Sequence, residues 1–285
     1  MRYTPPPLKV HGFEFKFDQP LIMAIINTTP DSFFDGSKNY HFEEATASGE
    51  KAIFQGAHIL DIGGESTRPG SERVSSEEEL KRVMPTVAWL AEQGHAVSID
   101  TMKAEVAQNA LDAGACIVND VSGGRFDDNM FSVVKDYGAA LVIGHMRGMP
   151  ETMQDNINFA DVVTEVSNEL KKTVAKALKA GISKNKIIID PGIGFGKTVE
   201  QCSILIARTG EISKQLELPV LIGVSNKSFI GNLSENAPVD KRTPGTVAAN
   251  IFSLLSGAHI FRVHDTFSAK QSFQVAQSII PFLKL

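Results

Sequence analysis

Short runs of β-branched and other apolar residues recur along the chain, and each run ends in a polar residue. We interpret eight of them as buried strands, because a continuous apolar run bounded by turn residues is typical of a strand covered on both faces. They are Leu21 to Ile26, His58 to Leu60, Ala96 to Ile99, Cys116 to Val118, Ala139 to Ile143, Lys186 to Ile189, Val220 to Val224 and His259 to Val263. Segments of helical composition separate most of the runs, such as Glu77 to Leu90, Phe159 to Leu178 and Pro244 to Leu255.

The joints between helix and strand carry a repeated signal. Gly-Ala precedes a predicted strand at Gly56, Gly114, Gly138 and Gly257, and glycine in such a place is the left-handed residue that ends a helix. Strand–helix units repeated eight times predict an α/β fold, a closed (β/α)8 TIM barrel over residues 21–285. A doubly wound open sheet also alternates strand and helix, but it normally uses fewer strands and leaves edges exposed.

The first twenty residues do not follow this repeat. Leu8 to Val10 and Phe13 to Phe17 alternate around His11-Gly12, which predicts a β-hairpin that covers the bottom of the barrel. We therefore expect residues 1–20 to form an N-terminal hairpin segment and residues 21–285 a single barrel domain. No linker, low-complexity tract or block of like charges divides the longer part.

Composition excludes several classes of protein. A net charge of −5 argues against a dedicated nucleic-acid binder, which usually carries a basic domain or stripe. No run approaches the ~20 apolar residues of a membrane span, and the first residues lack the apolar stretch of a signal peptide. Cys116 and Cys202 have no CxxC spacing and favour free thiols in a reducing compartment. We expect a cytoplasmic protein that contacts neither membrane nor nucleic acid and holds any anion by a local cluster.

The polar residues that end the apolar runs are the candidate site, because the carboxyl ends of the strands carry the active site of a barrel. They are Asn27, Asp61, Asp100, Asn119, His145, Asp190, Ser225 and His264. Each residue alone is equally well explained as the N-cap of the following helix. For Asp61 and Ser225 both explanations stay open, whereas the whole set at one rim favours a polar binding site.

Two long, glycine-rich loops follow the first two strands. Loop one, residues 27–37, offers oxygens to a hard cation and two aromatic side chains that could cover a flat substrate, although its turn sequences explain it as well. Loop two, residues 61–71, places Thr67 and Arg68 at the rim, a hydroxyl and a guanidinium suited to phosphate or carboxylate.

Positive charge and a glycine-rich turn follow the later strands. Arg262 and His264 leave one strand on the same face, near Lys227, and a phosphate site at this place recurs in the fold. The stretch from Asp190 to Lys197 is not a phosphate loop, because three residues rather than four separate Gly192 from the Gly-Lys pair. Its glycines suit the close approach of a flat ring, with Asp190 accepting hydrogen bonds from one edge of that ring.

Seven stretches in order along the chain resemble the dihydropteroate synthase family of pterin-binding barrels. They are residues 27–33, 61–70, 98–101, 119–120, 145–150 with 152–154, 190–197 and 262–265. The resemblance implies a transferase of folate biosynthesis that joins 6-hydroxymethyl-7,8-dihydropterin diphosphate to p-aminobenzoate, giving 7,8-dihydropteroate and pyrophosphate. It further implies Mg²⁺ as cofactor, sulfonamides as competitors of p-aminobenzoate, and a homodimer.

The resemblance also implies roles for individual residues. Those expected to bind the pterin diphosphate are Thr67, Asp100, Asn119, Asp190, Lys227, Arg262 and His264. Those expected to form the p-aminobenzoate pocket are Phe33, Thr67, Pro69 and Ser228, and Asn27 is the expected ligand of the metal. The expected catalytic residues are Arg68, Lys227, Arg262 and His264, since catalysis in the family rests on stabilising the leaving anion and positioning the amine.

One position departs from the family pattern, and two other functions stay open. Asn226 stands in Ser225-Asn226-Lys227-Ser228, where many members carry arginine; we expect this position to be peripheral. A pterin-binding barrel that moves a methyl group from methyltetrahydrofolate to a corrinoid protein would have no use for a diphosphate site, so Asn27, Thr67-Arg68 and the Arg262/His264 pair favour the synthase. Intact loops one and two argue against a catalytically silent pterin-binding barrel.

Overall fold

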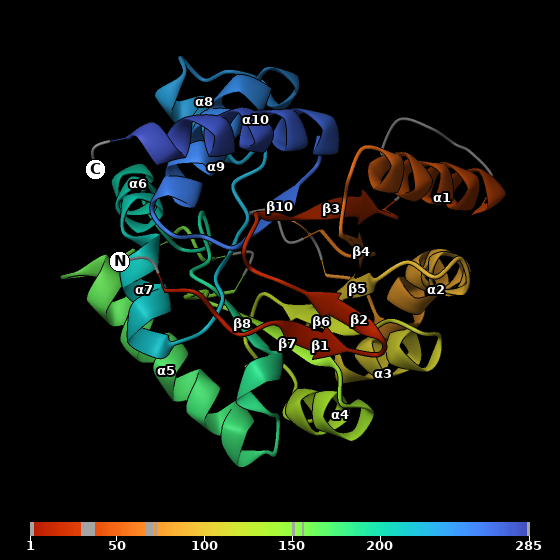
Figure 1. The fold of residues 1–285 in the computed structure, drawn as a ribbon. Helices are drawn as coiled ribbons and strands as arrows, with labels where there is room; N and C mark the ends of the chain where they lie inside the picture. The colour runs from red at the N-terminus through yellow and green to blue at the C-terminus, as the bar shows by residue number, and fades with distance from the viewer. Residues whose placement is uncertain are drawn as a thin grey trace.

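An eight-stranded parallel barrel forms the centre of the molecule (Figure 1). The structure, a computed structural model, describes residues 3–29, 38–66, 71, 73–149, 152–155 and 157–283, with only the backbone of residues 38–41. The barrel strands are β3 (Leu21–Asn27), β4 (Ile59–Gly63), β5 (Val97–Asp100), β6 (Ile117–Asp120), β7 (Ala140–Gly144), β8 (Ile187–Asp190), β9 (Leu221–Ile222) and β10 (Ile260–Val263). They pair in the order β8-β7-β6-β5-β4-β3-β10-β9, and a parallel bridge between Ile189 and Val220 closes the ring. The predicted TIM barrel is confirmed.

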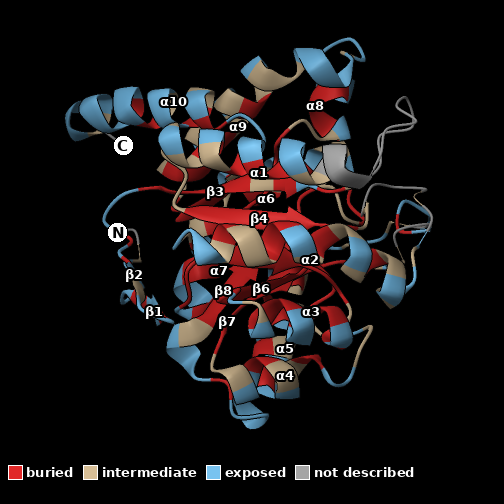
Figure 2. Cartoon of the chain, turned by 90° about the vertical axis from the view of Figure 1, so that its right-hand side faces the viewer, coloured by how far each residue is buried: buried red, intermediate tan, exposed pale blue. Residues whose placement is uncertain are grey.

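Helices surround the strands, with buried inner faces and exposed outer ones (Figure 2). They are α1 (Lys38–Phe54), α2 (Ser76–Glu92), α3 (Ala104–Asp112), α4 (Met130–Tyr137), α5 (Val162–Lys179), α6 (Val199–Ala207), α7 (Thr209–Leu216), α8 (Ser228–Leu233), α9 (Thr243–Leu255) and α10 (Thr266–Ile279). Short 3₁₀ turns occupy Lys184–Lys186, Val239–Lys241 and Ile280–Phe282. In the part of the chain that is described, no helix is both long and apolar enough to cross a membrane.

The predicted joints recur in the structure. Gly56, Gly114, Gly138 and Gly257 have φ of 101°, 101°, 60° and 104°, the left-handed region in which glycine has no steric penalty. Helix α2 begins after Ser75, whose side chain accepts a hydrogen bond from Glu78 N at 3.2 Å. The predicted strand Val220 to Val224 was too long, because regular pairing is limited to Leu221–Ile222.

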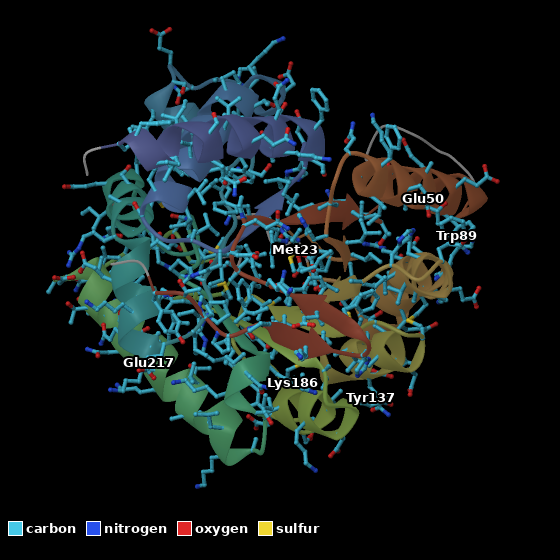
Figure 3. All side chains as sticks on the ribbon, viewed as in Figure 1. Met23, Glu50, Trp89, Tyr137, Lys186 and Glu217 are labelled. Atoms are coloured by element: carbon cyan, nitrogen blue, oxygen red, sulfur yellow. The ribbon has the colours of Figure 1, made fainter. Side chains whose placement is uncertain are left out.

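The N-terminal hairpin covers the bottom of the barrel, as predicted. Strands β1 (Leu8–Val10) and β2 (Phe13–Phe15) pair antiparallel, with Leu8 opposite Phe15. Their buried side chains and Phe17 pack against residues near the beginnings of the barrel strands, among them Leu21, Met23, Ile59, Ile117, Ala140, Leu221 and Ile260. Met23 is fully buried near the centre of the barrel (Figure 3). The opposite end, where the strands finish, is left for the polar residues.

Candidate functional site

Arg262 on β10 links two carboxylates at the carboxyl end of the barrel. Its Nε donates to Asp61 Oδ2 and its Nη2 to Asp100 Oδ2, each at 2.5 Å. Asn119 Nδ2 donates to the same oxygen of Asp61 at 3.0 Å. Although burial opposes it, these two aspartates raise the pKa of Arg262. Four side chains from four strands therefore form one charged cluster in the barrel mouth.

Within this cluster, the carboxyl group of Asp100 has a pKa close to neutral pH. Burial raises the pKa of Asp100 to about 7, and the Arg262 guanidinium counteracts part of that rise. Asp61 is fully buried, and its Oδ1 has no hydrogen-bond partner among the described residues. An unpaired buried oxygen of this kind is costly unless a ligand or water donates to it.

A second group surrounds Asp190 at the end of β8. Asp190 is buried, and its Oδ1 accepts a hydrogen bond from Gly192 N at 2.7 Å. Burial raises the pKa of Asp190, whereas nearby Lys227 lowers it. Lys227 Nζ donates to Ile193 O and lies 4.3 Å from the centre of the Phe195 ring. Burial lowers the pKa of Lys227 to about 8, and Asp190 counteracts this effect.

His264 lies just beyond β10 and is held by Ser225. The Ser225 hydroxyl lies 2.9 Å from His264 Nδ1 and also accepts a hydrogen bond from His264 N at 3.1 Å. Ser228 begins α8 and is exposed. Asn27 ends β3 with an exposed side chain, opposite Gly63 in the strand register. Ser225 thus orients His264, which is a candidate for binding an anion.

Among the helices whose N-caps the structure describes, none has a rim residue as its N-cap. The N-cap explanation of the rim residues is therefore wrong for these helices. Those N-caps are Ser75, Lys103, Asn129, Asp161, Thr198, Arg208, Lys227, Arg242 and Asp265. Asp61 instead pairs with Arg262 and Asn119.

The structure brings together only part of the predicted site. Asp100 and Asn119 meet around Asp61 and Arg262, while Asp190 and Lys227 form the neighbouring group. Phe33, Thr67, Arg68 and Pro69 lie outside the described residues, so their roles stay predictions. Sequence reasoning gave no role to Lys103, which pairs with Glu65 in loop two and with buried Glu79 on α2.

The geometry defines a barrel enzyme. Polar side chains from at least five strands converge at the carboxyl ends, where barrel enzymes carry their active sites. Carboxylates accept hydrogen bonds from a donor-rich ligand, and the cations beside them suit acceptors or an anion.

Comparison with known proteins identifies the class. The family model of pterin binding enzymes matches residues 23–264. A dihydropteroate synthase of Synechocystis sp. is 40% identical over 279 residues, which cover 97% of this chain and 96% of that protein. The structure of Xanthomonas albilineans dihydropteroate synthase with 4-aminobenzoic acid has a TM-score of 0.90 and 39% identity, covering 97% of this chain and 99% of that one. A Yersinia pestis dihydropteroate synthase with a sulfonamide drug has a TM-score of 0.91 and 35% identity, covering 97% and 100%. The chain therefore belongs to the pterin binding enzymes, and among them to the dihydropteroate synthases, which are transferases.

Proposed function

We propose that this chain condenses 6-hydroxymethyl-7,8-dihydropterin diphosphate with p-aminobenzoate, forming 7,8-dihydropteroate and pyrophosphate in folate biosynthesis. The observation that carries the proposal is the set of buried Asp100, Asn119 and Asp190 with half-buried Lys227 at the barrel mouth. A pterin presents N–H donors on one edge and ring acceptors on another. Buried carboxylates with a neighbouring ammonium complement both, and methyl transfer would leave the cationic side of the site without a diphosphate to bind.

The chemistry asks for anion stabilisation rather than a strong base. The bond between the pterin methylene carbon and the diphosphate oxygen breaks with its electron pair on oxygen, and the aromatic amine then forms the new C–N bond and loses a proton. Arg262 is the proposed contact of the departing diphosphate, because its Nη1 makes no hydrogen bond to the described residues while Nε and Nη2 are fixed. We assign His264 and loop-two Arg68 to the same anion.

We further propose that Mg²⁺ binds with the diphosphate. The described residues hold no group of three or more His, Cys, Asp or Glu side chains that could retain a metal alone. Asn27 offers one exposed amide oxygen at the rim, and Mg²⁺ commonly takes one or two protein oxygens together with substrate phosphates and water. This donor set fits a metal that supplies positive charge to the leaving group.

Inhibition by sulfonamides tests the proposed function and its second substrate together. The proposed p-aminobenzoate pocket, with Phe33, Thr67, Pro69 and Ser228, should also accept a sulfonamide. When a sulfonamide is added, the KM for p-aminobenzoate in dihydropteroate formation should rise, and kcat should stay unchanged. Inhibition that no concentration of p-aminobenzoate relieves would place the drug elsewhere.

The departure at Asn226 should have little effect on activity. Asn226 has φ of 56°, a conformation that asparagine tolerates well, and its amide N donates to Thr246 Oγ1 at 3.0 Å. We expect Asn226→Arg to change kcat/KM only a few fold, with a small loss of stability. Asn236→Arg, at another left-handed position with φ of 60°, is the matched control. A change of ~100-fold, about 2.7 kcal/mol, would refute a peripheral role.

We propose that a second copy of this chain covers the outer face of α9 and α10. The two helices pack against each other (Figure 1), and several of their apolar side chains are exposed. Phe252 is 63% and Phe267 56% exposed, more than a monomer needs to leave in water. The double variant Phe252→Glu/Phe267→Glu should sediment as a monomer where the parent protein sediments as a dimer. Phe54→Glu, at a 90% exposed site on α1, should stay dimeric; a parent monomer would contradict the proposal.

We also propose a cytoplasmic location. Cys116 and Cys202 are both buried free thiols, a state that a reducing compartment maintains.

A further inference from the structure

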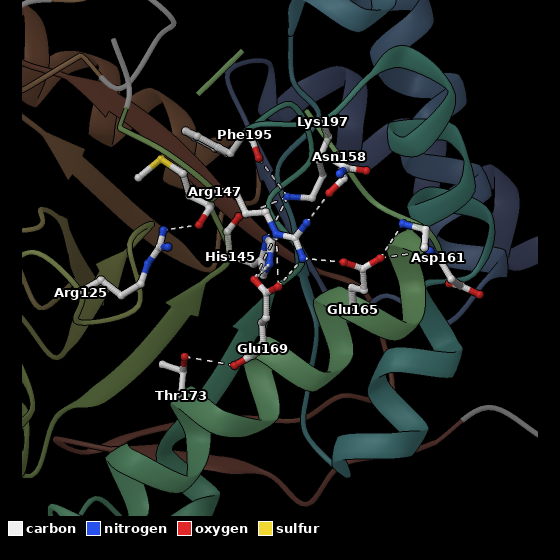
Figure 4. Close-up of polar contacts among 12 residues, drawn as sticks. Arg125, His145, Arg147, Asn158, Asp161, Glu165, Glu169, Thr173, Phe195 and Lys197 are labelled. Atoms are coloured by element: carbon white, nitrogen blue, oxygen red, sulfur yellow. Dashed lines mark hydrogen bonds and ion pairs between the residues drawn. The ribbon is translucent and has the colours of Figure 1, made fainter. Parts of the chain in front are cut away.

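Lys197, at the end of the glycine-rich β8–α6 connection, is buried and makes no ion pair with a carboxylate of the described residues. It is 3% exposed. Its Nζ lies 3.0 Å from His145 Nδ1, 3.0 Å from Phe195 O and 3.4 Å from His145 O (Figure 4). Burial lowers the pKa of Lys197 to about 7. Removing an amine from water is costly unless its hydrogens are paired, so these contacts account for its presence here.

His145 is set to accept one of those hydrogens. Its Nε2 lies 2.9 Å from Glu169 Oε2, and Arg147 donates to the same carboxylate (Figure 4). Burial, followed by the charge of Lys197, lowers the pKa of His145 to about 4. A neutral ring that donates from Nε2 keeps the Nδ1 lone pair for Lys197. The lysine ammonium therefore has an acceptor for each of its three hydrogens.

The same connection touches the site residues. His145 N donates to Asp190 O at 2.9 Å, and a Cβ on Gly192 would lie 1.8 Å from His145 O, so the two loops are in direct contact. Two contacts of the Lys227 side chain come from this connection, namely Ile193 O and the Phe195 ring. Fixing the backbone at Phe195 therefore fixes the surroundings of the Lys227 ammonium.

We propose that Lys197 is a positioning residue for pterin binding, which ties the β8–α6 connection to His145 and so holds Ile193 and Phe195 where they orient Lys227. The proposal rests on the proposed function, because it takes Lys227 as a pterin contact. Lys197 itself touches no substrate in this scheme. It acts through the connection, and its loss should affect the pterin more than p-aminobenzoate.

Lys197→Met tests the proposal, since it keeps an unbranched, flexible side chain, one atom shorter, and removes its N–H donors. We expect the Kd of a bare pterin and the KM of the pterin diphosphate to rise about tenfold, roughly 1.4 kcal/mol. The KM for p-aminobenzoate should stay unchanged, and amide hydrogen exchange should accelerate in residues 191–198 but not across the barrel. Lys186→Met is the matched control. Lys186 is a half-buried lysine just before the same strand, and its Nζ donates to Gly138 O.

The outcomes separate this proposal from the proposed function. Parent protein that makes no dihydropteroate would reject the function, whereas pterin titration judges Lys197 without turnover. An unchanged pterin Kd in folded Lys197→Met, or equal rises in both KM values, would overturn the positioning role. Lys197→Gln keeps two hydrogens and should show an intermediate loss. If this milder variant also fails to fold, Lys197 is purely structural and the proposal is wrong.

Discussion

Asp190→Asn is expected to weaken the binding of a bare pterin about 100-fold, or ~2.7 kcal/mol. In the proposed pose the buried Asp190 carboxylate accepts hydrogen bonds from the pterin edge, and such charge-assisted bonds contribute about 1.5–3 kcal/mol each. An asparagine amide would turn a donor toward a donor, while its oxygen could still accept from Gly192 N. Pterin titration by calorimetry measures the effect.

A matched control distinguishes this loss from general disturbance. Asp127 Oδ2 accepts from Ala104 N at 2.8 Å at the start of α3, and no proposed ligand contact involves it. Asp127→Asn should lower stability slightly and leave the pterin Kd unchanged. If Asp190→Asn also left the Kd unchanged, Asp190 would not be the pterin contact.

Arg262→Ala is expected to damage both stability and diphosphate binding. The substitution leaves Asp61 and Asp100 buried without their partner, and breaking a buried ion pair in this way costs about 3–5 kcal/mol. Affinity should fall further for the pterin diphosphate than for the bare pterin. The bare pterin should lose some affinity as well, because Arg262 also holds Asp100 in place.

The stability loss should depend on pH. The folded-state pKa of Asp100 is raised from 3.8 to about 7, so between these values the folded protein binds a proton that the unfolded chain releases. Stability therefore falls as pH rises through this window, and without Arg262 the pKa rises further, so the fall extends to higher pH. Urea unfolding at acid and neutral pH should show a smaller effect of Arg262→Ala in acid. Arg208→Ala, which breaks an exposed pair with Glu211, should change the free energy of unfolding little at either pH. Equal losses for Arg262→Ala at both pH values would contradict the raised pKa of Asp100.

The barrel could be predicted from the sequence because its parallel strands are buried on both faces and form separate apolar runs. Strand β9 was the exception, since the chain leaves regular pairing before Asn226, whose φ of 56° turns it toward α8. Local sequence does not report how far pairing with neighbours extends. The hairpin was predictable because its alternation and its His11-Gly12 turn are local.

The connections within the site could not be predicted, because they join residues far apart in the chain. Asp61 and Arg262 are 201 positions apart, and His145 and Lys197 are 52 apart. Residue type suggested that Asp100 and Arg262 belong to a polar rim, but it did not indicate that Arg262 also lies between two carboxylates. Glu169 lies within α5 and carries no signal that distinguishes it from a solvent-exposed glutamate.

The most direct test measures both products of one reaction. Purified protein receives 6-hydroxymethyl-7,8-dihydropterin diphosphate, p-aminobenzoate and Mg²⁺, and pyrophosphate and 7,8-dihydropteroate are followed together. The account predicts that the two products form in equal amounts, that dihydropteroate requires both substrates, and that Asp190→Asn slows both alike. Folded protein that binds a bare pterin yet forms no dihydropteroate would contradict it.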